Sequence, residues 1–190
     1  MAIFYRGAGI GTWWHKHGPG PKGWKAHSPY MEASETRLMN HIAEGSTASP
    51  FISLTRSYGV ALNYARNSGL SRPNRRRRAF VWEIELEEPL PDGLRLHDPV
   101  KRIANHVPHP LATIPYQHNG APTCLIGLID ITQEKLLAQI CPVPPNSNPP
   151  YGPPNISLGL KTLIFALRDA EVLATGVIPK ECVRRRYDVF

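Results

Sequence analysis

The chain has 190 residues, which is enough for one domain with a sizeable core and marginal for two. A hydrophobic content of 42% with 19% charged residues is typical of a soluble globular protein, and no apolar run approaches the roughly 18 residues needed to cross a membrane. The net charge of +7 favours nucleic acid or an acidic protein surface as a partner but does not specify a fold.

The three cysteines are widely spaced and form no CxxC pair, so neither a disulfide framework nor a zinc site is supported. The first residues lack the basic and apolar segments of a secretory signal peptide. We therefore expect a protein that folds in a reducing cytoplasm, with later delivery into a target cell left open.

The first predicted strand, residues 3–7, ends in Arg6 and Gly7. An arginine at the end of a buried strand is costly unless it meets an anion or a carboxylate. Gly7 leaves the backbone open to close approach by a ligand. No helix is expected after Gly11, so a Rossmann dinucleotide motif is excluded.

Aromatic and histidine residues follow among glycines and prolines, and they predict either packing under a long loop or the wall of a binding site. His15, His17 and His27 have no carboxylate or cysteine to complete a ligand set, so no metal site is predicted. Residues 30–44 are predicted to form a helix that begins at Ser28 or Pro29. The residues expected to form its apolar stripe are Met31, Leu38, Met39, Ile42 and Ala43.

A strand and a helix are predicted in succession over residues 49–65. Residues 51–55 alternate apolar residues with hydroxyls, which places Ser53 and Thr55 on one face. Ser57 is the expected cap of the following helix, which contains Tyr64. The two hydroxyls are predicted either to line a cleft or to be solvated on an edge strand.

The middle of the chain is less regular. Residues 67–78 predict a loop ending in four arginines, which form either a solvated face or a contact surface. We expect a strand over residues 80–86, a turn over 89–93, a short helix over 98–103, a buried strand over 124–131 and a helical turn over 132–139. The proline-rich tract 142–154 is expected to be a surface excursion of a single domain spanning residues 1–190.

Residues 158–167 are apolar and are predicted to form a strand. A second strand is expected from Glu171, followed by a turn at Gly176, a short strand, Pro179 and a further acid, Glu181. Asp169 stands two residues before Glu171. The composition and these patterns together support a mixed α+β protein and no more than that.

Three of these segments, in this order, resemble the mono-ADP-ribosyltransferase superfamily of the Arg-Ser-Glu type, the cholera- and pertussis-like toxins. Tyr5-Arg6-Gly7 is similar to the strand-end arginine of that family, and Ser53-Leu54-Thr55 with the following Ala-x-x-Tyr-Ala is similar to its hydroxyl strand. Residues 171–181, Glu-Val-Leu-x-x-Gly-x-Ile-Pro-x-Glu, look like its glutamate strand. Residues 127–134 imitate the end of this last motif, but no carboxylate lies upstream of them, so Glu171 is preferred.

The resemblance implies an α+β fold known as a split β-sandwich, with two small antiparallel sheets, flanking helices and an NAD+ cleft between the sheets. It implies transfer of ADP-ribose from NAD+ to a macromolecular acceptor, protein or nucleic acid, with release of nicotinamide and without a metal. Glu171 would stabilise the cation-like ribose and Arg6 would pair with NAD+ oxygens. Ser53 would orient Glu171. Gly7, Thr55 and Tyr64 would line the NAD+ site.

In the family, the residue two before the catalytic glutamate is often Gln or Glu and helps to present the acceptor. Asp169 is a shorter acid that could still act as a base toward an arginine-like acceptor, but with a different reach. This departure leaves an NAD+ glycohydrolase on the same fold as an alternative. A second alternative is a non-catalytic basic module that binds nucleic acid through Arg75–Arg78 and Arg184–Arg186.

A toxin or effector of this type would act in a target-cell cytoplasm and would have a cognate immunity or inhibitor protein. The sequence identifies neither that partner nor the acceptor. It also leaves the oligomeric state and the delivery route undetermined.

Overall fold

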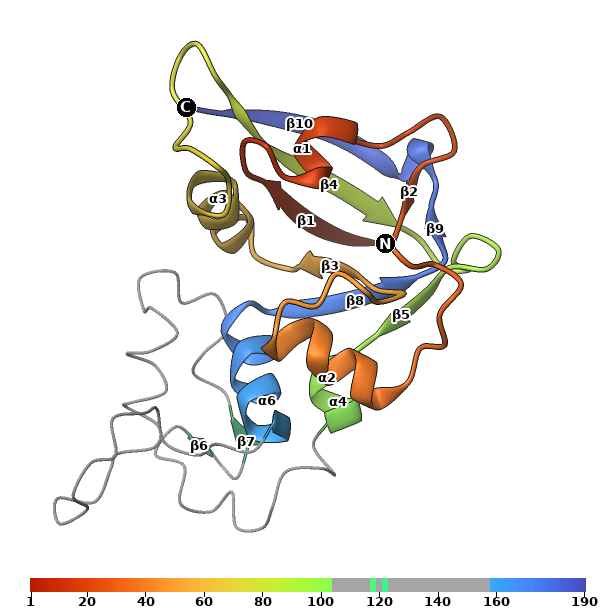
Figure 1. Ribbon diagram of the computed structural model, residues 1–190. Coiled ribbons are helices and arrows are strands. Elements are labelled where there is room, and N and C mark those ends of the chain that lie inside the picture. The colour runs from red at the N-terminus through yellow and green to blue at the C-terminus, as the bar shows by residue number, and fades with distance from the viewer. Residues whose placement is uncertain (104–116, 119–120, 123–157) are drawn as a thin grey trace, which may run out of the picture.

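A six-stranded antiparallel sheet organises the chain (Figure 1). The structure is a computed structural model that describes residues 1–103, 117–118, 121–122 and 158–190. In spatial order the strands are β10 (Val183–Val189), β4 (Ala79–Leu86), β1 (Ala2–Ala8), β3 (Ile52–Thr55), β8 (Glu171–Thr175) and β5 (Arg95–His97). Two smaller sheets pair β2 (Trp24–Lys25) with β9 (Val177–Ile178) and β6 (Gln117–His118) with β7 (Ala121–Pro122).

The large sheet is nearly divided between β1 and β3. β1 pairs with β4 along its whole length, from Ala2↔Leu86 to Ala8↔Phe80. Its pairing with β3 is confined to Tyr5↔Thr55. In Figure 1 the strands β10, β4 and β1 form an upper half, and β3, β8 and β5 form a lower half. The two sheets that the resemblance implies are thus joined into one at a narrow junction.

Helices pack on both halves. α3 (Tyr58–Asn67) lies against β1 and β4, whereas α2 (Glu35–Ala43), α4 (Pro99–Ile103) and α6 (Leu158–Arg168) lie together against the lower half (Figure 1). α1 (Trp13–His17) follows β1, and a 3₁₀ turn, η3 (Lys180–Cys182), leads into β10. The described part of the chain is therefore α+β, with a mostly antiparallel sheet and flanking helices.

Separate apolar clusters hold these layers. Phe4, Trp14, Ile52 and Leu54 belong to the cluster that bridges β1 and β3 on one face of the sheet. On the opposite face of the sheet, α3 packs through Ala61 and Ala65 against a cluster that includes Val81 of β4. Leu38 of α2, Phe51, Ile103 and Leu173 form the cluster under the lower half.

Several predicted elements are confirmed. Strands form at β1, β3 and β4, and the short helix α4 ends at Ile103 as expected. Ser57 caps α3, because its side chain accepts a hydrogen bond from the backbone N–H of Val60. The chain after Glu171 forms β8, turns at Gly176 with a φ of 92° and continues as β9.

Three expectations were wrong. Residues 158–167 form most of the helix α6 and not a strand, because an uninterrupted apolar run has the same pattern in a buried helix. The predicted helix 30–44 begins only at Glu35, capped by Ser34, so Met31 lies outside it and is 38% exposed. A helix does follow Gly11, since Thr12 accepts from the N–H of His15 and starts α1.

The antiparallel pairing of β1 still excludes a Rossmann unit, which requires parallel strands. The predictions for residues 124–131, 132–139 and 142–154 lie outside the described residues.

Candidate active site

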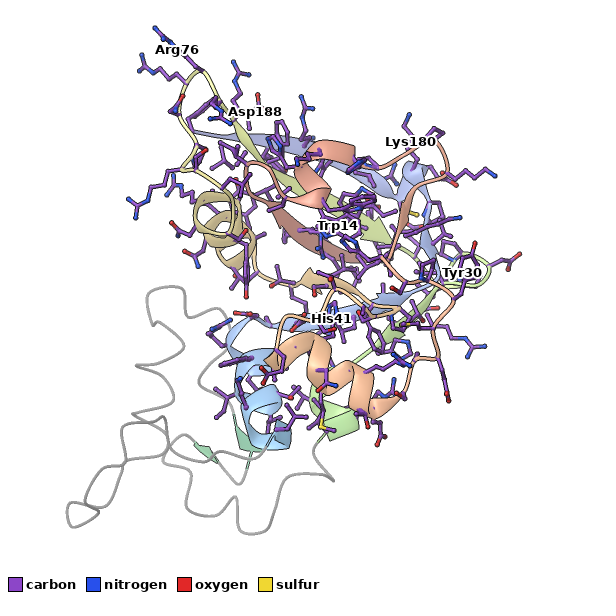
Figure 2. The ribbon with its side chains drawn as sticks, in the orientation of Figure 1. Trp14, Tyr30, His41, Arg76, Lys180 and Asp188 are labelled. Carbon is purple, nitrogen blue, oxygen red and sulfur yellow. The ribbon has the colours of Figure 1, made fainter. Side chains whose placement is uncertain are left out.

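A cavity of about 560 Å³ opens beside the junction of β1 and β3. It is lined by residues of β1, β3 and β8 together with parts of α2 and α3. The site residues predicted from the sequence all line it: Arg6, Gly7, Ser53, Thr55, Tyr64, Asp169 and Glu171. Figure 2 shows Trp14 on the β1 side of this junction and His41 on the β3 side.

Where β1 and β3 separate, the side chain of Arg6 supplies a hydrogen bond to the backbone of β3. Its Nη1 donates a hydrogen bond to the carbonyl oxygen of Ser53, and its guanidinium lies 4.0 Å from the centre of the Trp14 ring. Burial lowers the pKa of Arg6 to about 9, although Glu171 and Tyr64 oppose the change. Its Nε is buried and has no hydrogen-bond partner among the described residues. Arg6 is therefore a buried cation that lines the cavity and has one donor without a partner among the described residues.

Ser53 is linked to His41 of α2, a residue that the sequence did not single out. The Nε2 atom of His41 lies 2.8 Å from Ser53 Oγ, and its Nδ1 lies 2.6 Å from Ser49 Oγ and 3.1 Å from the Ser46 carbonyl oxygen. Burial and the charge of Arg6 lower the pKa of His41 to about 4, so its ring is neutral at pH 7. A neutral ring has one donor and one acceptor, which gives the Ser53–His41 pair a defined direction.

That direction depends on the charge of Glu171. When Nδ1 of His41 donates to the Ser46 carbonyl, Nε2 accepts and the Ser53 hydroxyl donates to it. An ionised Glu171 can only accept, so Ser53 must then donate to Glu171 while His41 presents Nε2–H to Ser53. Ser49 can donate to Nδ1 in this second state. The three side chains can therefore adjust together when Glu171 gains or loses a proton.

Glu171 begins β8 directly beside β3, where it pairs in register with Thr55. It is buried, and burial raises its pKa to about 8, with the charge of Asp169 acting in the same direction. Hydrogen bonding with Ser53 and the positive charges of Arg6 and Arg168 oppose this rise. A carboxylate in such an environment interacts strongly with any positive charge that develops in the cavity.

Asp169 forms a closed cluster with Arg168 and Tyr64, in which each side chain hydrogen-bonds to the other two. Arg168 donates to both of its carboxylate oxygens at 2.6 Å, from Nε to Oδ1 and from Nη2 to Oδ2. The Tyr64 hydroxyl donates to Oδ2 at 2.5 Å and accepts from Arg168 Nη2 at 3.0 Å. Burial lowers the pKa of Arg168, but Asp169 outweighs burial and the net direction is upward. Burial and Asp169 both raise the pKa of Tyr64.

Comparisons with protein-family models, curated proteins and solved structures give no match for this chain.

Gly7 and Thr55 line the cavity and also hold its walls in place. A Cβ built on Gly7 would lie 2.1 Å from the carbonyl oxygen of Ala61, so the absence of a side chain lets α3 pack directly on β1. Thr55 donates to the carbonyl oxygen of Asp169 at 2.5 Å and accepts from the backbone N–H of Ser57 at 3.0 Å. Both residues therefore have structural partners that the sequence did not indicate.

The described residues contain no group of three His, Cys, Asp or Glu side chains placed to hold a metal ion. Within the same residues, no helix combines the length and the apolar character that a membrane crossing requires.

Proposed function

We propose that this chain is a mono-ADP-ribosyltransferase that transfers ADP-ribose from NAD+ to a macromolecular acceptor and releases nicotinamide. The observation that carries the proposal is the convergence of Arg6, Ser53 and Glu171, from three separate segments, on one cavity. The nearly divided antiparallel sheet also fits the split β-sandwich that the resemblance implies.

The chemistry of the cavity fits cleavage of the nicotinamide–ribose bond. This reaction develops positive charge on the ribose, and a buried carboxylate stabilises that charge more than it stabilises the ground state. Glu171 would supply this carboxylate and contact the ribose. Arg6, which lines the cavity, would bind phosphate or ribose oxygens of NAD+ through its guanidinium. Ser53, held by His41, would keep Glu171 in place.

The proposed setting is that of a bacterial toxin or effector domain. Such a protein is made in one cytoplasm, acts in that of a target cell and is controlled by a cognate immunity or inhibitor protein. The acceptor is a protein or a nucleic acid.

The decisive experiment measures nicotinamide release from NAD+ by purified protein, with and without cell lysate. We expect release that lysate accelerates and that Glu171→Gln reduces by at least about 10²-fold, because the amide cannot offer a negative charge. Glu181→Gln is the matched control, since this exposed carboxylate belongs to the same sequence motif but does not line the cavity. An unchanged rate in Glu171→Gln would contradict the proposal.

An NAD+ glycohydrolase is a second candidate, favoured by the closed cluster around Asp169. Release that is equally fast without lysate, and that still requires Glu171, would support it. The basic nucleic-acid-binding module is the remaining alternative. It would show no release, no NAD+ binding and unchanged nucleic-acid binding in Glu171→Gln.

A further inference from the structure

The cavity contains a second carboxylate that already accepts hydrogen bonds at both of its oxygens. Asp169 is buried and receives three hydrogen bonds of 2.5–2.6 Å from Arg168 and Tyr64. Arg168 is itself buried, and it approaches Asp169 with two parallel N–H donors, which is the geometry in which a carboxylate binds a guanidinium most strongly.

An arginine side chain would need such a carboxylate in order to act as an acceptor. In that step a guanidinium nitrogen bonds to C1′ of the ribose, the bond from C1′ to nicotinamide breaks, and its electron pair leaves with nicotinamide. The attacking nitrogen must also lose a proton. Because a guanidinium keeps its proton at any ordinary pH, a nearby carboxylate must hold it and take that proton.

Glu171 is committed to the ribose in the proposed reaction, so Asp169 is the buried carboxylate that remains near it in the described cavity. Glu44 also lines the cavity, but it is exposed and pairs with Lys161. We infer that Arg168 is a built-in guanidinium that occupies the acceptor side of the cavity and excludes arginine side chains as acceptors. Arg168 is thus a specificity-determining residue. This inference rests on the proposed function and narrows its acceptor to water or to a nucleophile other than a guanidine.

The backbone holds this arrangement at a fixed position. Ala170, between Asp169 and Glu171, has a φ of 46°, a left-handed conformation that residues with a Cβ rarely adopt. Its N–H donates to the Leu167 carbonyl oxygen, and its own carbonyl oxygen accepts from the backbone N–H of Arg56. The turn between α6 and β8 therefore presents Arg168 and Asp169 beside Glu171 as one unit.

The test uses agmatine, a small guanidine, as the acceptor. Purified wild type, Arg168→Gln and Arg168→Gln/Asp169→Asn are each incubated with NAD+ and agmatine. Nicotinamide release, free ADP-ribose and ADP-ribosyl-agmatine are then quantified. We expect wild type to form free ADP-ribose and little agmatine product. Arg168→Gln should raise the ratio of agmatine product to free ADP-ribose by about 10²-fold, the effect of a newly available general base.

The double variant should lose this rise in the ratio of agmatine product to free ADP-ribose, because the amide that replaces the Asp169 carboxylate cannot accept a proton. An Arg168→Lys variant should retain the low ratio of the wild type. Agmatine modification by wild type as efficient as by Arg168→Gln would overturn the inference. It would also be overturned if Arg168→Gln released nicotinamide but showed no rise in the ratio of agmatine product to free ADP-ribose. ADP-ribose found on Arg168 itself by peptide mass spectrometry would overturn it too. Absence of nicotinamide release from wild type would instead contradict the proposed function.

Discussion

Burial raises the pKa of Glu171 to about 8 in the ligand-free protein, so its protonated form is favoured more than in an exposed glutamate. In the unfolded chain the same carboxyl group titrates near 4.5. The folded state therefore binds this proton more tightly than the unfolded state. The resulting contribution to stability is fully present below pH 4.5 and is lost as the pH rises through about 8.

Glu171→Gln tests this directly, because glutamine is neutral at every pH. At pH 5 we expect the two proteins to have similar free energies of unfolding. At pH 9 the variant should be more stable by on the order of 4 kcal/mol, which corresponds to the difference between the two pKa values. Urea unfolding at both pH values measures this, with Glu181→Gln as the control. Equal stability of wild type and Glu171→Gln at pH 9 would contradict the burial of a charge at this position.

Single residues of the candidate site were predictable to different degrees. Arg6, Ser53 and Glu171 each lie in a local pattern of strand, turn or helix that the sequence displays, and all three line the cavity. His41 and Arg168 were not predicted. His41 lies in an ordinary amphipathic helix, and Arg168 directly follows the segment 158–167, which the sequence predicts to be a strand. Their roles depend on how α2 and α6 pack against β3 and β8, which no local pattern contains.

At the scale of elements, the close contact between α3 and β1 fixes the positions of two elements that line the cavity. A methyl group on Gly7 would meet the backbone of Ala61 and Ala65 at 2.1 and 2.8 Å. Backbone atoms in a helix cannot move aside singly, so the whole of α3 would have to shift away from the sheet.

We therefore expect Gly7→Ala to lower the free energy of unfolding by about 3 kcal/mol, the scale of overpacking a buried contact. Gly20→Ala is the matched control, because a Cβ there would have no neighbour closer than 3.7 Å and the φ of Gly20 is not in the left-handed region. Thermal or urea unfolding of the two variants tests the difference. Similar stabilities would show that α3 is not held against β1 in this way.

The elements that sequence patterns predicted well have one solvent-facing side. β4 alternates, and α3 has a capping serine and an exposed face. α6 is different, because Leu163, Ile164, Phe165, Ala166 and Leu167 are all buried between α2, α4 and β8. A run of consecutive buried residues has no period to detect, and only the length of eleven residues favours a helix.

At the scale of the whole molecule, the positive charge is unevenly compensated. Arg78 and Arg186 pair with Asp188, and Arg184 pairs with Glu85. Arg75, Arg76 and Arg77 are exposed and form no ion pair with the residues that the structure describes. Figure 2 shows Arg76 at the tip of the loop before β4, far from His41 at the cavity.

The exposed arginines of this loop lead us to predict a binding site for a polyanion that is separate from the cavity. Replacing Arg75, Arg76 and Arg77 by serine should weaken binding to a short DNA duplex and reduce the slope of log affinity against log salt by roughly 2–3. The control replaces Arg184 and Arg186, whose charges are already paired, and should change the slope less. Nicotinamide release should be unaffected by the loop variant. Equal slopes for the loop variant and wild type would contradict a role for this loop.

The near division of the sheet also has a consequence for the order of events during synthesis. Arg6 lies in the first strand, whereas Glu171 lies in a strand that follows α6, and β3 connects the two. While the ribosome is still translating the middle of the chain, β1, β3 and β4 have been made, but β8 and β10, one strand from each half, have not. The cavity, which Glu171 lines, is therefore completed only after β8 has been synthesised.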